Sequence, residues 1–242
     1  MKKGIAASKG YAIGTVFIQE HEEIIISDAK VSDIAAEKEK LSKALAQSKE
    51  QLEAIKEKTA KEIGEHEAQV FEAHLMLLDD VEFTGQMEMT IENDQLNAMK
   101  AVQNVTDTFV MIFDSMDDPY MRERAADIKD VSKRIIANLA GKGGNGMENV
   151  GVNTVVVAHD LTPSDTAQLD RSKVIGFLTN IGGRTSHSAI MARTLEIPAV
   201  VGLGDITTSV KNGDTVIVDG IEGVAIINPD EATINEYKAC LL

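Results

Sequence analysis

The sequence has no tryptophan, a single cysteine, four prolines and only 4% aromatic residues in 242 positions. The lone Cys240 excludes an internal disulfide and is typical of a reducing cytosol, so we expect a cytoplasmic protein. No apolar run is long enough to span a bilayer, and residues 1–5 lack the apolar core of a signal peptide. These absences exclude disulfide-rich scaffolds and membrane proteins, and the length suits one or two domains.

Positive charge is also scarce, because 24 Lys and Arg face 39 Asp and Glu, which gives a net charge of −15. No basic patch could offset that field, so nucleic acid is excluded as a general partner and a basic partner is favoured. Between residues 33 and 130 there are 23 acidic and 11 basic side chains, a difference of −12, so most of the excess lies there. This acidic excess belongs either to a helical surface that faces solvent or to a surface that binds a basic protein.

The same acidic segment has the apolar periodicity of helices. The expected helices cover about 33–64, 70–78, 102–116 and 119–139. We expect a turn near Thr84 and Gly85, while Asp118 followed by Pro119 is typical of a helix start. The last helix should end in a glycine cluster formed by Gly141, Gly143, Gly144 and Gly146. Four amphipathic helices with short links predict a helical bundle.

Short apolar runs on both sides of this segment predict strands. They cover residues 10–18, 154–158, 174–179, 199–202, 215–218 and 224–227, with a turn at Asp219 and Gly220 before the last. Helical stretches between these strands predict an α/β layer architecture into which the helical segment is inserted. We therefore expect a discontinuous α/β domain over 1–27 and 147–230, an all-α domain over 28–146, and a C-terminal linker helix over 231–242.

One stretch, residues 182–193, combines a glycine pair, two arginines, hydroxyls and a histidine directly after a predicted strand. The glycines allow a sharp turn, and Thr185 or Ser186 can cap a following helix. His187 is then expected in the first turn of that helix. Free backbone N–H groups and the positive end of the helix dipole attract anions there, phosphate above all.

His187 is therefore a candidate phosphoryl acceptor, because neutral imidazole is a nucleophile near pH 7. Arg184 and Arg193 can pair with phosphate oxygens. The plainer alternative is a histidine that only caps or packs.

The stretch 182–193 resembles the phosphohistidine signature of Enzyme I, the phosphoenolpyruvate–protein phosphotransferase of the bacterial sugar phosphotransferase system. Pyruvate phosphate dikinase and phosphoenolpyruvate synthase share a similar signature on a swivelling phosphohistidine domain. Residues 74–80, 120–128 and 160–168 also resemble Enzyme I segments. The resemblance covers essentially the full chain and implies a phosphohistidine swivelling α/β domain with an inserted four-helix bundle.

This resemblance implies that His187 carries a phosphoryl group on Nε2 and passes it to a histidine of the phosphocarrier protein HPr. It implies that the Thr166 hydroxyl orients the ring by bonding its other nitrogen, the alternative being a helix cap. Arg184 and the first-turn N–H groups would hold the phosphoryl oxygens. The family's C-terminal domain, which binds phosphoenolpyruvate and Mg²⁺ and makes a homodimer, has no counterpart here, so we expect a monomeric fragment without cofactor.

By the same resemblance, HPr would dock on the early helices and the start of the last one. The candidate contact residues are Glu65, His74, Leu77, Glu82, Phe83, Phe113, Tyr120, Met121 and Arg124. Each apolar member could equally belong to the core of the bundle. His66 and His74 lie eight residues apart without further ligands in view, so we expect no metal site.

Three hypotheses remain open. The first is a domain that passes phosphate between His187 and HPr. The second is a swivelling domain of a dikinase or synthase, with small-molecule partners. The third is a non-catalytic helical interaction module on an α/β scaffold, in which His187 is structural.

Overall fold

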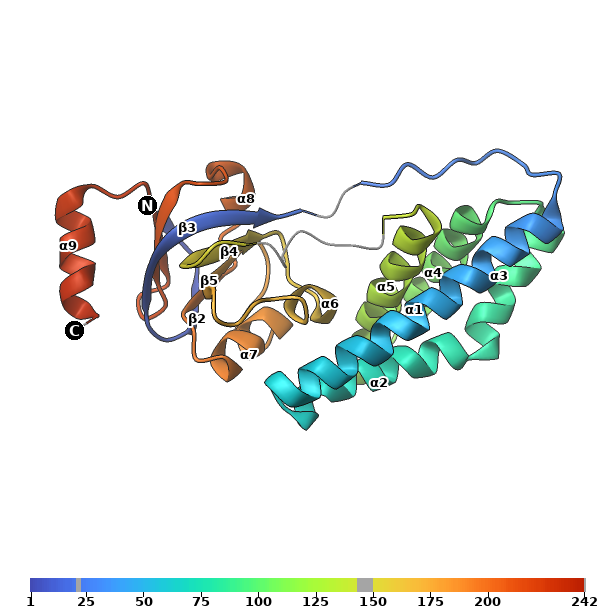
Figure 1. Ribbon diagram of the computed structural model, residues 1–242, viewed down its shortest axis with the longest axis horizontal. Helices are drawn as coiled ribbons and strands as arrows, with labels where there is room; N and C mark the ends of the chain where they lie inside the picture. Colours follow the sequence, from blue (N-terminus) through green and yellow to red (C-terminus); the bar gives the residue numbers. More distant parts are fainter. Residues whose placement is uncertain (21–22, 143–149, 242) are drawn as a thin grey trace. The chain divides into compact units, whose positions relative to one another are not determined.

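The computed structural model describes residues 1–20, 23–142 and 150–241. It divides the chain into two compact units, one formed by Met1–Glu22 with Asn145–Leu242 and the other by Glu23–Gly144 (Figure 1). The first unit is α/β and the second is helical, so the expected fold class is confirmed. Three of the four glycines predicted to end the last bundle helix lie outside the described residues, whereas Gly141 follows that helix with a φ of +72°.

The α/β unit is built on one mixed sheet. Its described strands are β1 (Lys2–Lys3), β2 (Ile5–Ser8), β3 (Tyr11–Gln19), β4 (Thr154–Ala158), β5 (Val174–Thr179), β6 (Ala199–Val201), β7 (Thr215–Asp219) and β8 (Val224–Ile227). The spatial order is β1-β8-β7-β3-β4-β5-β6-β2, and β3, β4, β5 and β6 are parallel to one another. The structure therefore adds β1 and β2, which are too short to show a period in the sequence.

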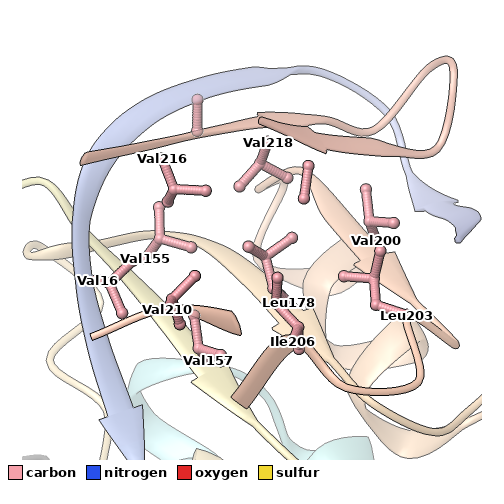
Figure 2. Close-up of a cluster of buried hydrophobic side chains, with 12 residues drawn as sticks. Val16, Val155, Val157, Leu178, Val200, Leu203, Ile206, Val210, Val216 and Val218 are labelled. Atoms are coloured by element: carbon pink, nitrogen blue, oxygen red, sulfur yellow. The ribbon is translucent and has the colours of Figure 1, made fainter. Parts of the chain in front are cut away.

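The sheet curls, because β1 and β2 stand at opposite ends of the strand order and yet only Gly4 separates them in the chain. The Gly4 N–H donates to the Gly223 carbonyl at 2.8 Å, and a Cβ at Gly4 would lie only 2.5 Å from the Val201 carbonyl oxygen. Glycine at this position thus lets the two edges approach. Figure 2 shows the curved sheet around its apolar interior, which includes Val155, Leu178 and Val218.

Four helices flank this sheet in the part of the chain that the structure describes: α6 (Pro163–Thr166), α7 (His187–Thr194), α8 (Ile206–Ser209) and α9 (Glu231–Cys240). None of the α9 residues is buried, and its Tyr237 hydroxyl donates to the Asp219 Oδ2 at 2.8 Å. The Tyr237 ring also meets the Tyr11 ring edge-on at 5.4 Å. The Tyr237 side chain therefore holds α9 against the sheet through both its hydroxyl and its ring. The linker role of residues 231–242 stays a prediction.

The helical unit contains one helix more than the sequence predicts. The described helices are α1 (Ile34–Glu62), α2 (Glu65–Asp79), α3 (Val81–Asp94), α4 (Ala98–Asp114) and α5 (Pro119–Leu139). Asp118 caps α5 by accepting from the Tyr120 N–H, and Pro119 occupies the first helical position, as predicted. The expected four-helix count was wrong, although a helical bundle is present.

Helix α3 was missed because Thr84 and Gly85 resemble a turn. In the structure the Asp80 carboxylate accepts from the Glu82 N–H at 2.9 Å and starts a new helix. The Thr84 hydroxyl donates back to the Asp80 carbonyl at 3.1 Å, so this residue supports the first turn. The buried Phe83, Met87 and Ile91 recur every four residues and tie α3 to the core strongly enough to tolerate the glycine.

Candidate phosphoryl-transfer site

The strand β5 ends at Thr179, and the chain then turns into α7. Gly182 has a φ of +114°, a left-handed conformation that favours glycine, and a Cβ there would lie 3.1 Å from the Ser186 Oγ. Ser186 is the N-cap, because its hydroxyl accepts from the Ala189 N–H at 3.3 Å and donates to the Gly183 carbonyl at 2.8 Å. His187 is therefore the first residue of α7, and it is half-buried.

Thr166 meets His187 in this structure. Its Oγ1 lies 2.9 Å from the His187 Nε2, and Thr166 itself is only 2% exposed. A capping box fixes the short helix α6, since Thr162 and Asp165 bond each other's backbone N–H groups. The expectation that the hydroxyl bonds the other ring nitrogen was wrong: it contacts Nε2, because α6 presents Thr166 to that edge of the ring.

The Thr166 hydroxyl has one proton to share among three near neighbours. Besides Nε2 these are the carbonyl oxygens of Pro163 at 3.1 Å and Thr162 at 3.3 Å, which can only accept. When the hydroxyl donates to a carbonyl, it accepts from a protonated Nε2; when it donates to Nε2, that nitrogen is the acceptor. In both arrangements the Thr166 oxygen lies within hydrogen-bond distance of Nε2.

The two arginines of the stretch have different surroundings. Arg184 is exposed in the turn, three residues before His187. Arg193 donates from Nη1 to the Ala7 carbonyl and from Nη2 to the Arg184 carbonyl, both at 2.7 Å. The Arg193 guanidinium thus holds two backbone carbonyls, and its pairing with phosphate stays a prediction.

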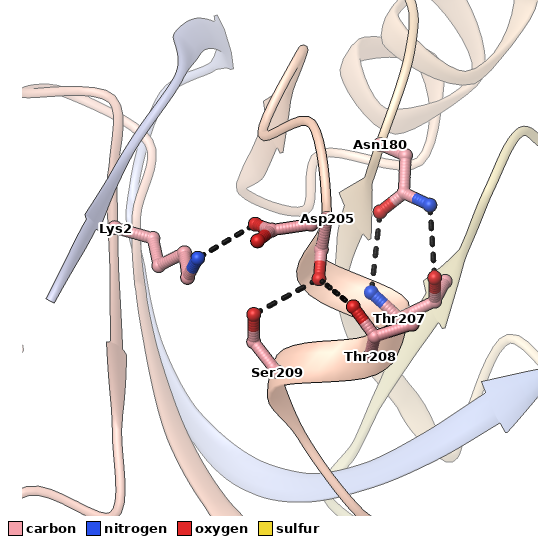
Figure 3. Close-up of polar contacts among 6 residues, drawn as sticks. All are labelled: Lys2, Asn180, Asp205, Thr207, Thr208 and Ser209. Carbon is pink, nitrogen blue, oxygen red and sulfur yellow. Dashed lines mark hydrogen bonds and ion pairs between the residues drawn. The ribbon is translucent and has the colours of Figure 1, made fainter.

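Sequence reasoning missed Asn180, which holds the end of β5 in place. Its Oδ1 accepts from the Thr207 N–H at 3.2 Å and its Nδ2 donates to the Thr207 Oγ1 at 2.9 Å (Figure 3). The same Nδ2 lies 3.1 Å from the His159 Nδ1. A polar residue directly after a buried strand was the available signal, and the side chain ties the start of the Gly182 turn to α8 and to the end of β4.

The start of α8 is fixed by further polar contacts. Lys2 donates from Nζ to the Asp205 Oδ1 at 2.6 Å, and this hydrogen bond holds the pKa of the Asp205 carboxyl below its usual range. The Asp205 carbonyl accepts from the hydroxyls of Thr208 and Ser209 (Figure 3). These contacts fix the start of α8, the helix to which Asn180 is bonded.

Three of the predicted HPr-contact residues lie in the helical core. His74 is 0% exposed and pairs through Nε2 with the Asp127 Oδ1 at 3.1 Å, and Phe83 is 1% exposed. Leu77 is buried as well. For Leu77 and Phe83 the alternative, bundle core, is what the structure shows, and His74 is buried as well, which the sequence analysis did not expect.

The other six predicted contacts reach the surface of the unit. Glu65, Glu82 and Tyr120 are exposed, while Phe113, Met121 and Arg124 are half-buried. The Arg124 guanidinium carbon lies 6.0 Å from the centre of the Phe113 ring. Their role in binding stays a prediction.

The structure also exposes apolar side chains that the sequence analysis did not select. On the helical unit they are Ile25, Met76, Val81, Met89, Met111, Ile112 and Met116. Ring contacts join Phe83 at the start of α3 to Phe109 and then to Phe113 on α4. These contacts bring the start of α3 to the end of α4, and Arg124 of α5 lies over the Phe113 ring.

Within the described residues, no group of three or more His, Cys, Asp or Glu side chains is arranged to hold a metal ion. No helix in this part of the chain combines the length and apolarity needed to cross a membrane.

Two family models match the chain. The model described as "PEP-utilising enzyme, N-terminal" matches residues 3–124, and "PEP-utilising enzyme, mobile domain" matches residues 151–223. The first match covers β2 and β3 of the α/β unit and the helical unit as far as α5, and the second covers the part of the α/β unit that carries His187.

Curated relatives carry the name phosphoenolpyruvate-protein phosphotransferase. That of Enterococcus faecalis is 51% identical over 240 residues, which cover 99% of this chain and 42% of the relative. That of Listeria monocytogenes is 51% identical over 236 residues, 98% of this chain and 41% of the relative. That of Bacillus subtilis is 48% identical over 236 residues, 98% and 41% respectively. The chain thus spans about two fifths of the length of these relatives.

Two solved structures are also similar. The NMR solution structure of Enzyme I (nEIt) superposes with a TM-score of 0.87 at 48% identity, covering 99% of this chain and 98% of that one. The N-terminal domain of Enzyme 1 – Nitrogen superposes with a TM-score of 0.65 at 25% identity, covering 100% and 99%.

Proposed function

Because the chain belongs to the family of phosphoenolpyruvate-protein phosphotransferases, the Enzyme I proteins, we propose that it accepts a phosphoryl group on His187 and exchanges it with a histidine of HPr. The observation that carries this proposal is the placement of His187 at the start of α7, behind the Gly182 turn and 2.9 Å from the Thr166 hydroxyl. The names of the relatives give phosphoenolpyruvate as the phosphoryl donor. As part of the proposal, phosphoenolpyruvate is also the donor for the full-length enzyme.

The proposed chemistry is a displacement at phosphorus between two imidazoles. The lone pair on the His187 Nε2 forms a new N–P bond while the N–P bond to the HPr imidazole breaks, and the departing imidazole keeps that electron pair. Such a transfer needs positioning and charge stabilisation more than covalent assistance. The first-turn N–H groups of α7, the Arg184 guanidinium and the Thr166 hydroxyl supply donors for the phosphoryl oxygens.

The hydrogen bond between Thr166 and His187 must open before Nε2 can react. A protonated Nε2 has no lone pair for phosphorus, and an Nε2 that accepts a hydrogen bond has its lone pair engaged by the Thr166 hydroxyl. We infer that the ring turns about its side-chain bonds to present Nε2. The freed hydroxyl then donates to a phosphoryl oxygen.

We propose that HPr binds the exposed apolar residues around the Phe83–Phe109–Phe113 ring contacts. The proposed centre is formed by Met111 and Ile112 at the end of α4 and by Tyr120 at the start of α5. Acidic side chains lie close to these residues in the chain, at Asp114, Asp117 and Asp118. An apolar centre with an acidic rim suits a partner whose own apolar patch has basic neighbours.

The proposal is tested by mixing the chain with phosphorylated HPr and following phosphate by ³¹P NMR. We expect an acid-labile phosphoramidate on the wild type and none on His187→Ala. His159→Ala is the matched control, because it removes another histidine of the same unit and should keep the label.

Three other outcomes would contradict parts of the proposal. A label that survives in His187→Ala and disappears in His159→Ala would show that His159, and not His187, carries the phosphate. No transfer to folded wild type would overturn the exchange with HPr and leave a dikinase-like swivelling domain or a binding module. If substitutions at Met111 leave phosphorylation by HPr unchanged, HPr does not dock on the helical unit as proposed.

A further inference from the structure

Arg193 lies in the last turn of α7, whereas His187 lies in the first. The Arg193 side chain nevertheless reaches back to the turn that precedes the helix. Nη2 donates to the carbonyl of Arg184, three residues before His187, at 2.7 Å. Nη1 donates to the carbonyl of Ala7 in β2, also at 2.7 Å. One guanidinium thus joins the last turn of α7, the turn that precedes His187 and a strand of the sheet.

The carbonyl in β2 is available because the strand is irregular there. Ala6 pairs with Val200 and Ser8 pairs with Ala199, so the register between β2 and β6 shifts at Ala7. A residue in such a bulge drops out of the ladder, and its backbone groups turn toward other partners. The main chain of β2 therefore offers a fixed acceptor on the α7 side of the sheet.

We infer that Arg193 is a positioning residue for phosphoryl transfer at His187; this inference rests on the proposed function. Its planar fork fixes the Arg184 carbonyl, and with it the path of the Gly182–Ser186 turn whose end caps α7. Arginine suits this task because its donors stand in a rigid fork, whereas lysine offers one compact charge. The turn carries both the Arg184 side chain and the first-turn N–H groups, so its displacement misplaces the donors for the phosphoryl oxygens.

The test compares Arg193→Lys and Arg193→Gln with the wild type in single-turnover transfer from phosphorylated HPr. Lys238→Gln on α9 is the matched control, because it removes an exposed cation from the same unit far along the chain. We expect the rate at saturating HPr to fall about 10-fold to 100-fold in both Arg193 variants, since small misplacements of reacting groups cost this much. The HPr concentration for half-maximal rate should stay the same.

A direct spectroscopic readout keeps the inference separate from the proposed function. In the wild type, a guanidinium held by two carbonyls should show slow rotation, with separate ¹⁵N signals for Nη1 and Nη2 of Arg193. The ¹⁵N ring signals of His187 should move in the Arg193 variants and not in Lys238→Gln. These signals do not require transfer to HPr.

A wild type that transfers phosphate, with both Arg193 variants transferring at the same rate, overturns the inference and leaves the proposed function standing. A single averaged Nη signal in the wild type overturns it whether or not the variants fold. Absence of transfer in the wild type, with separate Nη signals and shifted His187 resonances in the variants, overturns the proposed function and leaves Arg193 only as the residue that holds the turn before His187.

Discussion

Replacing Thr166 by valine removes the hydroxyl beside the His187 Nε2 and keeps a β-branched side chain of similar size. The fold should tolerate the change, because the two carbonyls that the hydroxyl also approaches have backbone donors. The Thr162 carbonyl accepts from the Thr166 N–H at 3.1 Å, and the Pro163 carbonyl accepts from the Ala167 N–H at 3.0 Å. The loss therefore falls mainly on the histidine.

The size of the effect follows from one neutral hydrogen bond. Such a bond contributes about 1 kcal/mol net, which is roughly a fivefold change in an equilibrium or a rate. Valine removes both the bond to Nε2, which must open before reaction, and the bond that the hydroxyl then donates to a phosphoryl oxygen. Because the second bond is made to a charged group and is stronger by about 1 kcal/mol, the net effect is slower transfer. We expect the transfer rate at saturating HPr to fall by about fivefold in Thr166→Val, with little change in the HPr concentration for half-maximal rate.

The assay is rapid-quench transfer from phosphorylated HPr, with ¹⁵N NMR of the His187 ring alongside to report the change at Nε2. Thr194→Val is the matched control, because the Thr194 hydroxyl donates to the Ile190 carbonyl at 3.0 Å in the same helix α7. Equal rates and unchanged ring signals in Thr166→Val would refute the reasoning. An equal loss of rate in Thr194→Val would show that any hydroxyl deletion near α7 has this effect.

Three further perturbations test other parts of the molecule. Phe83→Ala should lower the free energy of unfolding in urea by about 3–5 kcal/mol, because it empties a core position; a loss below about 1 kcal/mol would contradict that burial. Met111→Glu should weaken HPr binding by about tenfold or more in calorimetry, and unchanged affinity would remove this residue from the proposed surface. Burial, and then the hydrogen bond to Asp219, raise the pKa of Tyr237 from 10.0 to about 12. The protonated hydroxyl therefore stabilises the fold fully below pH 10, and this contribution is lost as the pH rises through about 12. Absorbance at 295 nm should lose the ionisation near pH 12 in Tyr237→Phe, and its persistence there would assign it to another tyrosine.

Local chemistry made much of the α/β unit predictable. The residues of β4 are Thr-Val-Val-Val-Ala and all are buried, which is the continuous apolar run that a strand covered on both faces requires. The turn at Gly182, the capping hydroxyl of Ser186 and the helix that begins at His187 follow from three neighbouring residues. The helical segment was harder, since the pair Thr84 and Gly85 favours a turn, while the Asp80 cap and the packing of Phe83, Met87 and Ile91 decide for a helix.

The sequence by itself therefore determined the class of each unit, the insertion of one in the other and the position of His187 at the start of a helix, because these depend on neighbours along the chain. Only the tertiary structure decided which edge of the imidazole meets Thr166, since that contact joins residues 21 positions apart through the packing of α6 against α7. It likewise decided that Arg193 holds the Arg184 carbonyl and that His74 is buried beside Asp127. Periodicity shows which face of a helix is apolar, but the partners of a long side chain depend on the elements that fold against it.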